Sequence, residues 1–95
     1  MSIVYLIKGH TGEYEDSIEW IAKAFKSKVS AQHYYKQLLN VIHTHNVKYK
    51  GADSIEIREA LERKLEALDP LCRIDYNGVY YEITEVKVLW LTNSW

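Results

Sequence analysis

Residues 3–25 read IVYLIKGHTGEYEDSIEWIAKAF, and this segment gives the strongest indication of the fold. Its β-branched and aromatic run from Ile3 to Lys8 predicts a buried strand that Gly9 closes. The polar segment 9–17 that follows predicts a loop longer than a tight hairpin. Residues 18–25 alternate imperfectly between apolar and polar, which favours a second strand antiparallel to the first. A helix that begins within this segment also fits the pattern.

A first helix is expected after these strands. Ser27 has the side chain that an N-cap requires, because its hydroxyl can accept a hydrogen bond from a free backbone N–H. From Lys28 to His45 the apolar residues recur at three- and four-residue steps, which is the stripe of an amphipathic helix. Residues 46–52 then form a connector.

A second helix follows the connector. Asp53 and Glu56 resemble a capping box at its start. Its apolar positions end at Leu68, and the helix itself is expected to end at Asp69, because the residue before Pro70 is pushed out of the helical region.

The rest of the chain predicts a hairpin. Residues 71–76 form a short strand, Asn77-Gly78 is the strongest turn signal in the chain, and 79–91 form a long strand. The alternation of apolar and polar residues in this last strand shifts by one position near Thr84-Glu85, which predicts a bulge there. The sequence therefore predicts one α+β domain over 1–95, in the order ββααββ. Two helices pack on one face of an antiparallel or mixed sheet.

Composition narrows the class of protein. The chain has 95 residues, a formal net charge of −1 and one cysteine, Cys72, so it cannot form an internal disulfide. The apolar run at the N-terminus is too short for a signal peptide or a membrane span, and we expect a cytoplasmic protein with no membrane partner. The near-neutral charge disfavours general nucleic-acid binding.

Charge is nevertheless segregated along the chain. Residues 20–50 hold six lysines and no acid, whereas 13–19 and 53–69 are rich in acids. Such segregation can serve a partner or the fold itself. Lysines without arginine disfavour specific recognition of bases or bidentate recognition of phosphates.

No catalytic or metal-binding constellation is found. The acids of the first loop lack calcium-loop spacing, and His43 and His45 would point about 200° apart on a helix, so neither set predicts a metal site. Cys72 lies beside Arg73, which can lower a thiol pKa, but strand alternation favours an inward Cys72. We therefore expect a protein that is not an enzyme and that uses no cofactor.

Aromatic residues are abundant, with eight tyrosines and three tryptophans. Tyrosine and tryptophan suit surfaces that are dry on one side and wet on the other, so some of them are expected in an interface. The others would pack the periphery of a small core.

Two segments, VYLIKGHTGEYEDSIEWIAKAF and LDPLCRIDYNGVYYEITEV, resemble a group of small phage, prophage or bacterial hypothetical proteins. That group has the pattern YLIxGxTGEYxDxxEWxxxAF near the start and LDPxxxxDYxGxxYxxxEV near the end. The resemblance implies a small phage-encoded accessory protein, and it implies no activity. The matching positions are Gly9, Thr11, Gly12, Glu13, Tyr14, Asp16, Glu19, Trp20, Asp69, Pro70, Asp75, Tyr76, Gly78 and Tyr81.

Two functions are therefore considered. The first is an interaction protein that inhibits a host defence or nuclease component by binding its surface, with a host or phage protein as partner. The alternative is a binder or sponge for a signalling nucleotide, with a pocket at an oligomer interface. The expected binding residues are His10, Thr11, Glu13, Tyr14, Trp20, Tyr76 and Tyr81. A homodimer is expected through the last strand, with Trp90, Leu91 and Trp95 in its interface, because an uncovered apolar edge is a template for pairing.

Overall fold

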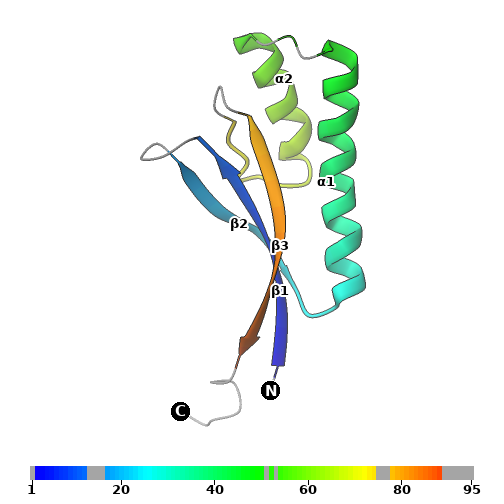
Figure 1. The fold of residues 1–95 in the computed structure, drawn as a ribbon, viewed down its shortest axis with the longest axis vertical. Coiled ribbons are helices and arrows are strands. Elements are labelled where there is room, and N and C mark those ends of the chain that lie inside the picture. The colour runs from blue at the N-terminus through cyan, green and yellow to red at the C-terminus, as the bar shows by residue number, and fades with distance from the viewer. Residues whose placement is uncertain (1, 13–16, 51, 53, 75–77, 89–95) are drawn as a thin grey trace.

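The computed structural model describes residues 2–12, 17–50, 52, 54–74 and 78–88. These residues form three strands and two helices in the order ββααβ, which confirms the α+β class (Figure 1). The elements are β1 (Ser2–Thr11), β2 (Ile18–Phe25), α1 (Lys28–Tyr49), α2 (Ile55–Glu66) and β3 (Val79–Val88).

The three strands form one antiparallel sheet in the order β2-β1-β3. β1 is the central strand, and it continues through Gly9, His10 and Thr11, which the sequence placed in a loop. These three residues are held in the sheet because each has a partner on both neighbouring strands; Gly9, for example, lies opposite Trp20 and Tyr81. Backbone pairing on both sides thus overrides the weak strand propensity of Gly9.

The expected strand at 71–76 is wrong in its described part, which has no strand between Leu71 and Ile74. The backbone turns there instead, because the N–H of Cys72 donates to the carbonyl of Asp69 over 3.0 Å. The N–H of Leu71 also donates to the Asp69 carboxylate, over 3.1 Å. Residues 75–77, and with them Asn77 of the expected turn, lie outside the described residues.

The bulge lies in a different strand from the one expected. The pairing of β1 with β3 runs without interruption through Thr84 and Glu85, so the predicted bulge is wrong. The register shifts instead between β1 and β2, where Ile7 pairs with Lys23 and Lys8 with Ile21. Ala22 is therefore an extra residue in β2. This bulge explains the imperfect alternation of 18–25, because it brings Trp20 and Phe25 to the same face of the sheet.

Helix α1 begins where the sequence predicts. The Ser27 hydroxyl accepts a hydrogen bond from the Ser30 N–H over 3.2 Å, which confirms the N-cap. The helix extends to Tyr49, beyond the expected start of the connector at 46, and Lys50 ends it in the left-handed conformation.

Helix α2 is capped one residue later than expected. The hydroxyl of Ser54 accepts from the Ile57 N–H over 3.2 Å, so Ser54 is the N-cap, and Asp53 lies outside the described residues. The helix ends at Glu66, and the N–H of Asp69 then donates to the Leu65 carbonyl over 2.7 Å in a tight turn.

Both helices contribute to one core on a single face of the sheet, called here the inner face. α1 packs against all three strands there, and α2 packs against α1 and adds Leu61 and Leu65 to the same core (Figure 1). The buried cluster consists of Ile7, Ala31, Tyr34, Leu38, Leu61, Leu65, Cys72 and Tyr81. No described helix is long and apolar enough to cross a membrane.

One end of the sheet is narrower than the other. The pairing of β2 with β1 reaches only to Tyr5, so residues 2–4 pair with residues 86–88 as a two-stranded ribbon. In Figure 1 this ribbon extends past the lower end of α1.

Candidate functional site

The structure divides the expected binding residues between the two faces of the sheet. Thr11, Trp20 and Tyr81 belong to the inner face, whereas His10 belongs to the opposite face, called here the outer face. The other expected binding residues and the expected interface residues lie outside the described residues: Glu13, Tyr14, Tyr76, Trp90, Leu91 and Trp95.

Buried Asp69 is the centre of a hydrogen-bond network on the inner face. Its carboxylate is fully buried, and Oδ2 accepts from Trp20 Nε1 over 2.8 Å and from the Tyr81 hydroxyl over 2.8 Å. Oδ1 accepts from the Leu71 N–H over 3.1 Å. A buried carboxylate is costly unless donors compensate it, and three donors surround this one. The network joins both edge strands to the turn after α2.

Trp20 and Gly9 are in direct contact. A Cβ added at Gly9 would lie 2.4 Å from two carbons of the Trp20 ring, so only glycine leaves room for the indole. The Trp20 ring also meets Tyr81 edge to face, with centroids 6.3 Å apart. Trp20 and Tyr81 therefore pack within the fold, and so does buried Thr11, whose hydroxyl donates to the Gly78 carbonyl over 2.5 Å.

Two tyrosines of the core, Tyr34 of α1 and Tyr81 of β3, have hydroxyls that are poor candidates for acid–base chemistry. Burial, followed by the charges of Asp69 and Cys72, raises the pKa of Tyr34 to about 12, and its hydroxyl donates to the Leu68 carbonyl over 2.6 Å. Burial also raises the pKa of Tyr81 above its usual range. Both groups therefore stay protonated near neutral pH and act as hydrogen-bond donors.

Cys72 is buried in the core, as strand alternation led us to expect, although its segment is a turn. Burial raises the pKa of its thiol to about 11, against a smaller lowering by the neighbouring Tyr81 hydroxyl. Because the thiolate is the nucleophile, a thiol in this environment is inert at neutral pH.

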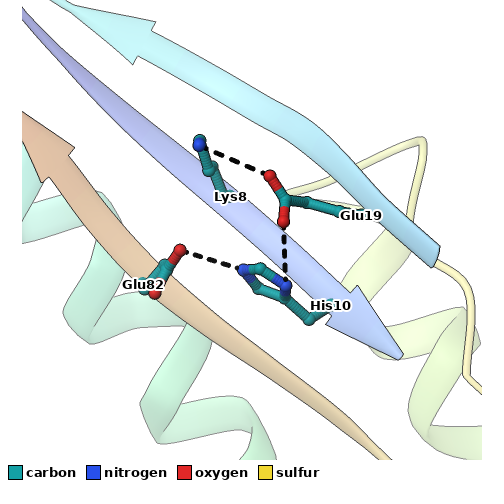
Figure 2. Close-up of polar contacts among 4 residues, drawn as sticks. All are labelled: Lys8, His10, Glu19 and Glu82. Carbon is teal, nitrogen blue, oxygen red and sulfur yellow. Dashed lines mark hydrogen bonds and ion pairs between the residues drawn. The ribbon is translucent and has the colours of Figure 1, made fainter. Parts of the chain in front are cut away.

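A polar cluster on the outer face brings all three strands together (Figure 2). His10 of β1 lies between two carboxylates, with Nε2 3.1 Å from Glu82 of β3 and Nδ1 3.4 Å from Glu19 of β2. Lys8 also reaches Glu19, over 3.4 Å. The Tyr80 ring stacks on His10 with centroids 4.5 Å apart and planes 3° from parallel.

The remainder of the outer face is largely apolar, and no described helix covers it. Directly paired residues share a face of the sheet, so the strand register assigns its members. The whole outer face, the polar cluster included, consists of Ser2, Val4, Leu6, Lys8 and His10 of β1, Glu19, Ile21 and Ala24 of β2, and Tyr80, Glu82, Thr84, Val86 and Val88 of β3.

Sequence reasoning selected His10 but missed its neighbours. Tyr80 and Glu82 were not chosen, because they lie about seventy positions away and only the pairing of β1 with β3 brings them to His10. Knowledge of that register would have identified them, because Tyr80 is the direct partner of His10.

The described residues contain no group of three or more histidine, cysteine or acidic side chains that could hold a metal ion. Glu19 and Glu82 face opposite nitrogens of the His10 ring, so the three side chains do not converge on one point. In comparisons with family models, with curated proteins and with solved structures, no match to this chain was found.

Proposed function

We propose that this chain is a non-enzymatic interaction protein that binds a partner protein through the outer face of its sheet. The observation that carries the proposal is the Tyr80–His10 stack. Tyr80 is 58% exposed, yet its ring is already ordered against His10. An exposed aromatic ring that loses little freedom on binding is a typical anchor of protein interfaces.

The groups around Tyr80 indicate the chemistry of the partner. Glu19 and Glu82 are about half exposed, at 53% and 48% of their side chains. A guanidinium group can stack on the free side of a tyrosine ring and pair with a neighbouring carboxylate at the same time. We therefore propose that the partner presents arginine to this end of the outer face, and that its apolar side chains cover Val4, Leu6 and Val86.

Nucleases and other nucleic-acid-binding defence components fit this description. Their binding surfaces are rich in arginine and lysine, because they neutralise phosphates. The resemblance of the sequence to small phage proteins implies a phage-encoded accessory protein, but it implies no activity. With a net charge of −1, the chain would act through this local surface and not as an overall mimic of DNA.

A plating assay with outer-face variants tests the proposal. The protein is expressed in bacterial strains that each carry one nuclease-based defence system, and phage plating is measured. The variants are Tyr80→Ala and Glu82→Gln, both at exposed positions of the outer face. The matched control is Glu59→Gln, which removes an exposed carboxylate from α2.

The proposal expects relief of at least one defence system by the natural chain and by the control variant. Tyr80→Ala should remove this relief, and titration calorimetry with the purified defence component should show weaker binding by about tenfold or more. Relief that the outer-face variants leave intact would contradict the proposed surface. The absence of relief in every strain would contradict the proposed function.

A further inference from the structure

A groove lies between β2 and the first half of α1, and it is lined by a different set of residues from those of the outer face. Its volume is about 410 Å³, which lies within the range of small-molecule sites. The polar and aromatic residues that line it are Lys23, Phe25, Ser30, His33, Tyr34 and Gln37.

Lys23 is the charged group of the groove. Its Nζ lies 5.4 Å from the ring centroids of both Phe25 and Tyr34, and it makes no ion pair with a described residue. None of the residues that line the groove is acidic, and residues 20–50 contain no acid at all. The groove therefore favours a negatively charged ligand.

The two rings and the helix supply the remaining contacts. Phe25 is partly buried, and its ring centroid lies 5.5 Å from that of Tyr34. Tyr34 is buried and its hydroxyl is bonded to Leu68, so Phe25 supplies the apolar surface of the groove and Tyr34 supports it from below. Ser30, His33 and Gln37 are spaced three and four residues apart on α1, which places them along one side of the helix. They offer hydrogen-bonding groups beside the apolar wall.

We propose that this groove binds a small anionic ligand with a planar ring, of the nucleoside monophosphate class. Lys23 pairs with the phosphate, the ring of the ligand packs against Phe25, and Ser30, His33 and Gln37 bond its polar edges. A cation beside an aromatic ring offers a nucleotide both a partner for its phosphate and a surface for its base. The groove shares no residue with the outer face, so each of the two proposals can be tested independently of the other.

Titration of the isotope-labelled full chain, followed by NMR, tests the site. The probes are the four ribonucleoside monophosphates, with the four nucleosides and inorganic phosphate as separate arms. Lys23→Gln removes the charge and Lys23→Arg keeps it. Lys48→Gln is the matched control, because Lys48 lies 5.4 Å from the ring centroid of Tyr49, outside the groove.

At least one monophosphate should bind with a Kd below about 1 mM and shift the amide signals of Ser30, His33 and Gln37. Lys23→Gln should weaken binding about tenfold or more, whereas Lys23→Arg and Lys48→Gln should bind as the natural chain does. Equal binding by Lys23→Gln would show that Lys23 only covers the rings, and would overturn the proposal. So would the absence of binding by all four monophosphates, or equally tight binding of phosphate or nucleoside alone.

Discussion

Trp20 and Asp69 are joined by a 2.8 Å hydrogen bond from the indole nitrogen to the carboxylate, across 49 positions of sequence. Tyr81 donates to the same carboxylate oxygen from the other edge strand. The turn after α2 is thereby fixed to both edges of the sheet through one buried side chain. A network of this kind contributes strongly only while each of its members is satisfied.

The variant Asp69→Asn should lower the free energy of unfolding by about 2–4 kcal/mol. All three groups that face Asp69 are donors, so an amide NH₂ in place of either oxygen meets a donor. Urea denaturation followed by tryptophan fluorescence measures the change. Tyr81→Phe removes a single donor and should cost less, about 1–2 kcal/mol. An Asp69→Asn protein as stable as the natural chain would show that the network is not stabilising.

Gly9→Ala should destabilise the fold by about 1–3 kcal/mol, the usual cost of overpacking. The reason is specific, since the added methyl would meet the Trp20 ring. The penalty should therefore shrink in a Trp20→Leu background, and a double-mutant cycle by urea denaturation measures the coupling. Additive effects of the two substitutions would count against contact with Trp20 as the cause.

Cys72 should react slowly with iodoacetamide in the native protein. With a pKa of about 11 in place of 9.0, its thiolate fraction at about pH 8 is roughly 100-fold lower than that of an ordinary thiol, and burial limits access further. Mass spectrometry over time, with the chain in urea as reference, measures the ratio of rates. Comparable rates in both conditions would contradict the buried position.

His45 should make the fold less stable in mild acid. Burial, with smaller effects of Lys64 and Lys48, lowers its pKa below the ordinary 6.5, and its Nδ1 has no hydrogen-bond partner among the described residues. The unfolded chain therefore binds a proton more readily, so the free energy of unfolding decreases as the pH falls below about 6.5. Urea denaturation from about pH 7 to about pH 5 should show a shallower decrease for His45→Gln. The control His43→Gln alters an exposed ring, and an equal change in both variants would refute the assignment.

We predict that the protein forms a homodimer through the open edge of β3. β3 is an edge strand of the described sheet, and its last described residues belong to the two-stranded ribbon beyond α1. A two-stranded ribbon is marginally stable alone, and pairing with a second copy would widen it. Sedimentation at tens of micromolar should give a dimer for the intact chain and a monomer for a chain truncated after Leu89. A monomeric intact chain would contradict the prediction.

Sequence patterns predicted those elements well that depend only on residues close to one another in the chain. Ser27 caps α1 because its hydroxyl needs only its own helix, and the 18–25 strand and both helices follow from apolar periodicity. The predicted bulge at Thr84-Glu85 was wrong because a bulge is a property of two strands. A slip of apolar phase in one sequence cannot show which partner carries the extra residue.

The site was harder to predict for the same reason. Thr11, Trp20 and Tyr81 were chosen for their residue types, but the side of the sheet on which each one lies depends on strand register. The outer-face cluster joins His10 to Glu82 across 72 positions, and no local spacing reveals such a contact. The groove beside α1 likewise combines β2 and helix residues whose patterns are separate in the sequence.

The extra residue in β2 makes one point of the sheet tolerant of a change in chain length. Without Ala22, Trp20 and Phe25 would keep the sides that they occupy now, because each would still face its present partner on β1. Deletion of a residue from the middle of β1 would instead turn every later side chain of that strand to the opposite face of the sheet. Because β1 is paired along both edges, the register with both neighbouring strands would be affected. A protein engineer who wants to shorten this domain can therefore remove Ala22 and keep every other side chain of β2 on its present face of the sheet.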